Sequence, residues 1–144
     1  MVTPEVLRAE GGTQARTASL PRTAESVGTG RRVVRRVLGE WALSGIADAA
    51  ELVTSELLTN AVQHARRDSV RLTVTRLSDR CVRVAVVDLS PSRPQPRAAR
   101  AGEESGRGLE IVEALSGGRW GVEMLREGKR VWAEVACEEA ENGD

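Results

Sequence analysis

Two polar residues, Glu56 and Asn60, stand in a stretch that is otherwise apolar and has the period of a helix. They are four residues apart, so on a helix they lie one turn apart on the same face. The apolar residues around them also recur at helical spacing, namely Leu52, Val53, Leu57, Ala61 and Val62. Burial of such a segment makes polar residues within it costly unless they have partners or bind a ligand. We therefore expect a ligand at this pair.

Three segments of the chain carry residue types that suit different parts of one ligand. The amide oxygen of Asn60 suits Mg²⁺, which prefers hard oxygen ligands and completes its shell with water and phosphate. The carboxylate of Glu56 is placed to accept a proton from an attacking hydroxyl group. Asp88 ends an expected strand, where a carboxylate can accept a hydrogen bond from an exocyclic amine such as that of adenine. Gly106 and Gly108 open an expected helix, where bare backbone brings N–H groups and the helix dipole to phosphate oxygens.

Other common site types are disfavoured by the sequence. No Gly-x-x-x-x-Gly-Lys-Ser/Thr motif is present, and Gly28-Thr-Gly30 is followed by Val33 where a dinucleotide-binding loop has glycine. One histidine and two separated cysteines do not favour a zinc site. No nucleophile-elbow motif accompanies His64, which we interpret as a packed, hydrogen-bonded structural residue rather than a catalytic one.

The elements that must position these residues follow from the periodicity of the apolar residues. Helical spacing predicts three helices, over residues 26–43, 47–65 and 106–115. Alternation predicts four strands, over residues 70–74, 82–86, 120–125 and 129–137, and residues 17–20 suit a short edge strand before a proline. The long Pro-, Ser- and Arg-rich loop over residues 89–105 is interpreted as a lid. Helices that precede and interrupt such strands favour an α/β (α+β) two-layer sandwich, with a mixed, largely antiparallel sheet and the helices on one face.

The composition is that of one ordinary globular domain. The 144 residues are 40% hydrophobic and 29% charged, which suits a single core. We expect disordered tails over residues 1–14 and 138–144, the second of them acidic, and a folded domain over residues 15–137. No apolar membrane span or signal peptide is found, so we expect a cytoplasmic protein. Cys81 and Cys137 lie in apolar, strand-like runs and are interpreted as buried free thiols.

The charges of the chain are balanced. Its 21 basic and 21 acidic side chains give a formal net charge of zero, so no global field draws it to DNA or to an anionic membrane. Four arginines on one expected helix leave nucleic-acid binding as a minor alternative, and they are Arg31, Arg32, Arg35 and Arg36. Partners are expected to be recognised through local contacts.

The polar segments, taken in order, resemble the motifs of a known family. The N, G1 and G2 boxes of the gyrase and histidine-kinase (GHKL) type of ATPase resemble Glu56-x-x-x-Asn60, Asp88 and Gly106-Arg-Gly108-Leu-x-Ile-Val. The sequence Ser-Glu-Leu-Leu-Thr-Asn-Ala-Val-Gln-His-Ala around the N box is most similar to that of the anti-sigma factor serine/threonine kinases of bacterial partner-switching systems. The resemblance spans about residues 15–137. It implies the Bergerat ATP-binding fold, in which helices and a mobile lid enclose Mg-ATP against the sheet.

The resemblance also implies roles and partners. The magnesium ligand would be Asn60, the general base Glu56, the adenine reader Asp88, and the phosphate-contacting backbone Gly106 and Gly108. Arg107, between the glycines, either reaches a phosphate or stays at the surface, solvated or paired with a glutamate. The cofactors implied are ATP and Mg²⁺, the substrate is a small anti-sigma factor antagonist of the STAS type, and the protein held is a sigma factor. Relatives commonly dimerise, so a homodimer stays open, while no direct nucleic-acid or membrane partner is expected.

One departure from the family pattern supports a second hypothesis. The G1 box of the family continues as Asp-x-Gly-x-Gly, whereas Asp88 here is followed by Leu-Ser-Pro-Ser-Arg-Pro. The alternative is therefore an ATP-binding or degenerate, non-catalytic module of the same fold that acts through protein contact. A sensor histidine kinase is not expected, because His64 lies inside the N box rather than in a preceding helix.

Overall fold

Six β-strands and three α-helices make up the part of the chain that the structure describes. The structure is a computed structural model, and it describes residues 5–8, 14–64, 68–88, 104–126 and 128–136. The elements, in chain order, are β1 (Glu5–Arg8), β2 (Gln14–Pro21), α1 (Glu25–Glu40), the short 3₁₀ helix η2 (Ser44–Ile46), α2 (Ala47–His64), β3 (Ser69–Ser78), β4 (Cys81–Asp88), α3 (Glu104–Ser116), β5 (Trp120–Leu125) and β6 (Gly128–Ala136).

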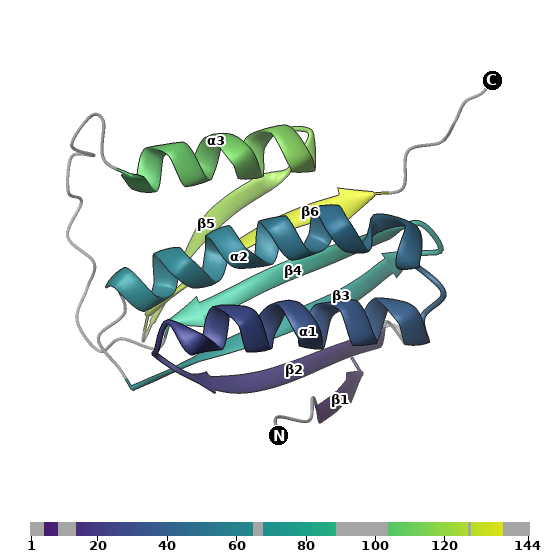
Figure 1. The fold of residues 1–144 in the computed structure, drawn as a ribbon, viewed down its shortest axis with the longest axis horizontal. Coiled ribbons are helices and arrows are strands. Elements are labelled where there is room, and N and C mark those ends of the chain that lie inside the picture. The colour runs from purple at the N-terminus through teal and green to yellow at the C-terminus, as the bar shows by residue number, and fades with distance from the viewer. Residues whose placement is uncertain (1–4, 9–13, 65–67, 89–103, 127, 137–144) are drawn as a thin grey trace.

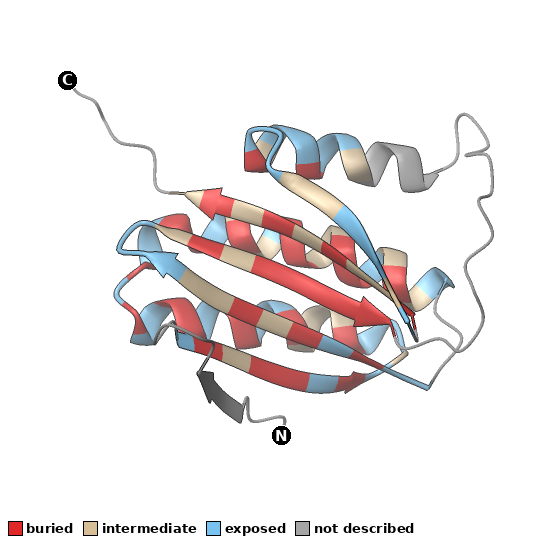
Figure 2. Ribbon diagram, turned by 180° about the vertical axis from the view of Figure 1, so that it is seen from behind, coloured by how far each residue is buried: buried red, intermediate tan, exposed pale blue. Residues whose placement is uncertain are grey.

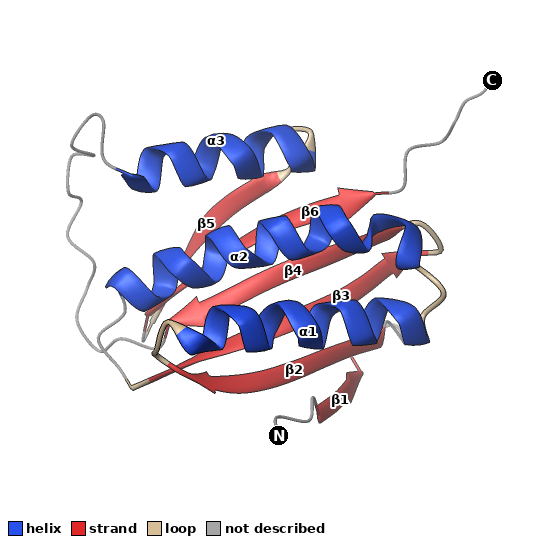
Figure 3. Ribbon diagram, in the orientation of Figure 1, coloured by secondary structure: helices blue, strands red, loops and turns tan. Residues whose placement is uncertain are grey.

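The strands form one sheet, and the helices cover one of its faces. The strand order is β1-β2-β3-β4-β6-β5, and each neighbouring pair is antiparallel. Helix α2 lies over the middle of the sheet between α1 and α3 (Figures 1 and 3). The opposite face, seen in Figure 2, has no helix over it among the described elements. The predicted two-layer sandwich with its helices on one face is thus confirmed. The sheet was expected to be mixed and largely antiparallel, and all of its described strand pairs are antiparallel.

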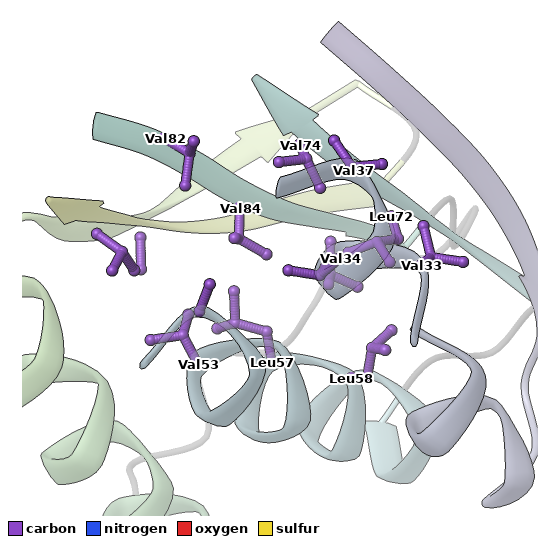
Figure 4. Packing of buried hydrophobic residues seen from close by; sticks show 14 of the residues in the cluster. Val33, Val34, Val37, Val53, Leu57, Leu58, Leu72, Val74, Val82 and Val84 are labelled. Atoms are coloured by element: carbon purple, nitrogen blue, oxygen red, sulfur yellow. The ribbon is translucent and has the colours of Figure 1, made fainter. Parts of the chain in front are cut away.

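The core lies between the helices and the sheet, and it follows from two simple periodicities. Alternate residues of β3 and β4 point toward the helices, and every third or fourth residue of α1 and α2 points toward the sheet. Figure 4 shows these side chains converging from the two layers. The fully or nearly fully buried members include Val34, Val37, Val53, Leu57, Leu58, Leu72, Val74, Val82 and Val84. Burial of this stripe holds α2 at a set height above the sheet.

Gly30 marks a close approach between α1 and α2. A Cβ atom at Gly30 would overlap Cδ1 of Leu58 on α2, and it would lie 3.4 Å from Cδ2 of Leu72 and 3.5 Å from Cδ1 of Leu20. Since Leu58 is fully buried, it has little room to move away. The glycine is therefore required by packing, and it lies inside a helix rather than in a nucleotide-binding loop.

The N-terminal part of the chain differs from expectation. Residues 5–8, within the segment expected to be a disordered tail, form β1 and pair with β2. The strand expected over residues 17–20 is confirmed as part of β2. Its expected position at the edge of the sheet is wrong, because β2 has neighbours on both sides, β1 and β3. On the β3 side, the hydroxyl of Thr17 donates to the Leu72 carbonyl at 3.1 Å and lies 2.8 Å from the Thr73 hydroxyl.

Two helix ends show which turn signals are reliable. The Ser-Gly-Gly sequence ends α3 as predicted, with φ values of 64° at Gly117 and 83° at Gly118. Helix α1 instead ends before the predicted Leu43. The chain turns at Ala42, whose φ is 61°, and the Leu43 N–H donates to the Leu38 carbonyl at 2.8 Å. Alanine rarely takes this left-handed conformation, so the sequence carried no signal for this end.

Cys81 is a free thiol, but the expectation that it is buried is wrong. It begins β4 and is half-buried. Partial burial raises the pKa of its thiol and nearby Glu134 adds to the rise, while Arg119 and Arg83 lower it. Cys137 and residues 138–144 lie outside the described residues. Within the described ranges, none of the helices has the length and apolar character needed to cross a bilayer.

Candidate functional site

Three segments that are far apart in sequence reach the same end of the molecule. The C-terminal half of α2, the end of β4 and the beginning of α3 lie at the left of Figure 1, and α2 contacts both β4 and α3. Glu56 and Asn60 lie on α2, Asp88 is the last residue of β4, and Gly106 and Gly108 lie near the start of α3. The fold therefore brings the elements that carry the expected site residues to one place.

The two flanks of α2 face different helices. Glu51 lies on the flank toward α1, where its carboxylate accepts a hydrogen bond from Nε of Arg35. At about 100° per residue, Asn60 lies about half a turn around the axis from Glu51, and Glu56 lies about 140° from it. Since α2 lies between α1 and α3 (Figure 1), both polar residues are on the flank toward α3.

Glu56 and Asn60 are half-buried. Within the described part of the chain, the side chains of both residues have neither a hydrogen bond nor an ion pair. Partly buried polar groups without protein partners are costly. The pair is therefore available to a ligand, and a purely surface role would leave it more exposed than it is.

Asp88 lies at the end of β4, in the sheet layer beneath the helices. It continues the helix-facing series of Val84 and Val86 along β4, and its exposed fraction is only 6%. Its cross-strand neighbour on β6 is Lys129. A carboxylate at the end of a buried strand, on the same side of the sheet as α2 and α3, is placed to accept a hydrogen bond from a ligand held between these elements.

The sequence did not indicate Lys129, because a cross-strand neighbour depends on register. Val131, two residues further along β6, pairs with Val86 and lies in the core. Trp132 lies on the opposite face of the sheet, where its ring packs against Gly121 and lies under the guanidinium of Arg83, with 4.7 Å from Cζ to the ring centroid. Lys129 is thus the β6 residue that lies opposite Asp88 in the sheet.

The beginning of α3 gives its two glycines different backbone settings. Gly106 is the third residue of the helix and Gly108 the fifth. The first four N–H groups of a helix have no acceptor within it. The N–H groups of Gly106 and Arg107 are therefore free of the helix ladder and suit a phosphate, while Gly108 contributes the absence of a side chain.

The oxygen ligands that the described side chains offer suit a magnesium ion that is held mainly by a nucleotide. Within the described ranges, no group of three or more His, Cys, Asp or Glu side chains is arranged to hold a metal ion. Mg²⁺ usually keeps several waters and is bound by one or two protein oxygens together with substrate phosphates. The Asn60 amide oxygen fits such a shell, and it would not retain the ion without a nucleotide.

His64 is not the packed structural residue that we expected. It is the last residue of α2, and its side chain is exposed. The apolar stripe of α2 ends at Ala61, so His64 lies beyond the contact with the sheet. A histidine at a helix C-terminus is compatible with the negative end of the helix dipole.

The arginine face of α1 is largely neutralised by carboxylates. Arg35 donates hydrogen bonds to Asp48 at 2.6 Å and to Glu51. These two hydrogen bonds raise the pKa of Arg35, and the one to Asp48 has the larger effect. Arg31 lies 3.7 Å from Glu51, and Arg36 forms a pair of the same kind with Glu40. Phosphate binding by a duplex would have to displace these acids, which argues against a nucleic-acid interface.

Comparison with known proteins was made on both sequence and structure. The family model of the histidine kinase-like ATPase domain matches residues 20–133. No curated protein matches the chain closely enough to count as a relative. A solved histidine kinase domain, from a blue-light activated histidine kinase of Erythrobacter litoralis, is 24% identical with a TM-score of 0.52, and the match covers 81% of this chain and 61% of that one. That structural likeness concerns the fold alone, and the chain spans less than two thirds of that structure.

Proposed function

The chain belongs to the family of histidine kinase-like ATPase domains, and on this basis we propose that it is an ATP-dependent serine/threonine kinase of the anti-sigma factor type. Membership implies ATP binding. The finer proposal is that the γ-phosphoryl group passes to a small antagonist protein of the STAS type, and that a sigma factor is held when the antagonist is modified. The similarity of the N-box sequence to the anti-sigma kinases supports the choice of subfamily.

One observation carries the proposal at the level of the site. Glu56 and Asn60 are half-buried on the flank of α2 that faces α3, and within the described residues their side chains have no partner. The end of β4, where Asp88 is the last residue, and the beginning of α3 reach the same end of the molecule (Figure 1). A ligand that presents an amine to Asp88 and phosphates with a metal ion to Asn60 and Gly106 would contact all of these groups together.

The residues would divide the work of phosphoryl transfer. Bound Mg²⁺ neutralises charge on the transferring phosphoryl group. Asn60 would hold the ion, and the N–H groups at the start of α3 would orient the phosphate oxygens. Glu56 would accept the proton of the attacking hydroxyl. Positioning and charge neutralisation supply most of the rate in this chemistry, so Asn60 is expected to matter more than Glu56.

We expect the Glu56→Gln variant to bind Mg-ATP as the wild type does and to transfer phosphate roughly 100-fold more slowly or worse. The amide keeps the size of the side chain but cannot accept the proton. The measurement pairs calorimetry of Mg-ATP binding with transfer of labelled phosphate to a purified antagonist protein. Glu51→Gln is the matched control, since it makes the same change on the flank of α2 that faces α1. A large loss of binding in Glu56→Gln would contradict its role as a base.

The proposal as a whole depends on two results. A folded protein that shows no calorimetric binding of Mg-ATP would overturn it. Binding with no phosphoserine or phosphothreonine on any candidate antagonist would favour the second candidate, a non-catalytic module of the same fold. The sequence that follows Asp88, Leu-Ser-Pro-Ser-Arg-Pro in place of the family glycines, favours that candidate, and it lies outside the described residues.

A further inference from the structure

We propose that Lys129 reads the base of the bound nucleotide together with Asp88. This inference rests on the proposed function, because it names a further residue of the same ATP site. Its starting point is the sheet register, in which Lys129 of β6 pairs with Asp88 of β4 on one side and with Met124 of β5 on the other.

Lys129 and Asp88 share the helix-facing side of the sheet. Val131, Ala133 and Val135 alternate along β6 and are at most 5% exposed in the core. Lys129 continues this series by two residues, so its side chain leaves the sheet on the side of α2 and α3. Arg130, the next residue, leaves on the opposite side and there binds Glu123.

The two side chains are close enough to act on one ligand group. Directly opposed residues on one face of an antiparallel pair have Cβ atoms about 4.5–5.5 Å apart. The four-carbon stem of lysine lets its ammonium group reach past this separation in several directions. Within the described ranges, half-buried Lys129 takes part in no hydrogen bond and no ion pair. A partly buried ammonium group without a hydrogen-bond acceptor is unfavourable, and a ligand that supplies an acceptor would stabilise it.

The choice of residue type at this position carries information. Lys129 is the one lysine in a chain whose basic residues number 21, so every other basic position has arginine. Arginine presents a planar fork that suits carboxylates and phosphates, whereas lysine is a compact point donor. A single acceptor atom, such as a ring nitrogen, suits an ammonium group better than a fork.

Adenine offers the pattern that this pair would recognise. Its exocyclic amine donates hydrogen bonds, and the ring nitrogens on either side of that amine accept them. The Asp88 carboxylate can accept from the amine while the Lys129 ammonium donates to a neighbouring ring nitrogen. Guanine has an oxygen acceptor in place of the amine. This oxygen and the Asp88 carboxylate are both acceptors, so they would repel each other. The pair therefore favours adenine over guanine.

The test compares the affinities of wild type and Lys129→Met for three nucleotides, ATP, 1-deaza-ATP and 7-deaza-ATP, by calorimetry with Mg²⁺ present. For ATP we expect Lys129→Met to bind about 10- to 100-fold more weakly, the loss of one hydrogen bond from a charged donor. Each deaza analogue replaces one of the two ring nitrogens beside the amine by carbon, so one of the analogues lacks the nitrogen that Lys129 contacts. For that analogue, the wild type and Lys129→Met should have the same affinity.

Two controls separate base reading from other roles. Arg130→Met removes a neighbouring charge from the opposite face of the sheet and should leave ATP affinity unchanged. Lys129→Arg keeps the charge and should retain part of the affinity for ATP. Circular dichroism and the urea midpoint of each variant establish that it is folded.

The outcomes distinguish this inference from the function on which it rests. If the wild type does not bind Mg-ATP, the proposed function fails. If the wild type binds and Lys129→Met binds ATP equally well, only the role of Lys129 is overturned. An equal loss for all three nucleotides would also overturn base reading, because it would indicate contact with the ribose or phosphates.

Discussion

Replacement of Asn60 by alanine is expected to remove the magnesium-dependent part of ATP binding and to weaken affinity by roughly 10- to 150-fold. In the proposed site, the amide oxygen of Asn60 would be the protein ligand of the ion, and the ion would in turn hold the phosphates. Calorimetry with ATP in Mg²⁺ and in EDTA separates the two contributions. The variant should resemble the wild type in EDTA and should gain little when Mg²⁺ is added.

Two further variants make this prediction specific. Asn60→Asp keeps an oxygen ligand, so a dependence on Mg²⁺ should remain. Gln63→Ala removes another carboxamide from α2, where it is exposed, and should leave binding unchanged. If Asn60→Ala lowers the affinity by the same factor with and without Mg²⁺, then Asn60 contacts the nucleotide directly and is not the metal ligand.

Leu58→Ala is expected to lower the free energy of unfolding by about 2–5 kcal/mol, the range for truncating a buried leucine. Leu58 is fully buried where α1, α2 and the sheet meet (Figure 4), so its removal leaves a cavity. Leu52→Ala is the same substitution on the same helix at a side chain that is 51% exposed, and it should cost no more than about 0.5 kcal/mol. Urea unfolding monitored by circular dichroism measures both, and similar losses in the two variants would contradict the packing described here.

The same leucine should be coupled to Gly30. In the wild type, Gly30→Ala places a methyl group against Cδ1 of Leu58, and overpacking of this kind costs about 1–3 kcal/mol. In the Leu58→Ala background the space is open, so the added methyl group should be neutral or stabilising, because alanine also favours the helix. A double-mutant cycle that gives additive changes would show that α1 and α2 do not meet at this point.

These two predictions concern one structural unit. The packing of Leu58 and its neighbours holds α2 on the sheet, and α2 in turn presents Glu56 and Asn60 toward α3. A destabilised α2 would therefore weaken ATP binding indirectly. Stability must be measured before any loss of binding in a core variant is assigned to the site.

Most of the elements could be predicted from the sequence, because local periodicity reports which residues a helix or strand buries. Strands β3 and β4 and the helix of Glu56 and Asn60 were predicted within a few residues. The predictions failed where the outcome depended on distant segments, or where a turn was made by a residue type that does not usually mark one. β2 was expected at an edge because of Pro21, but β1 and β3 lie on either side of it. α1 ends at Glu40, and the turn that follows uses Ala42 in a conformation that usually marks glycine.

By itself, the sequence determined that α2 has an apolar face and a polar pair at one-turn spacing, because that pattern depends on the helical period alone. It also determined the order of the three motifs, all of which lie within residues 20–133, the range that the family model matches. The tertiary structure alone decided which helix lies on each flank of α2, that β2 is an inner strand, and that Lys129 stands beside Asp88. These facts depend on strand register and helix packing between distant segments, and local periodicity does not encode which distant segments become neighbours.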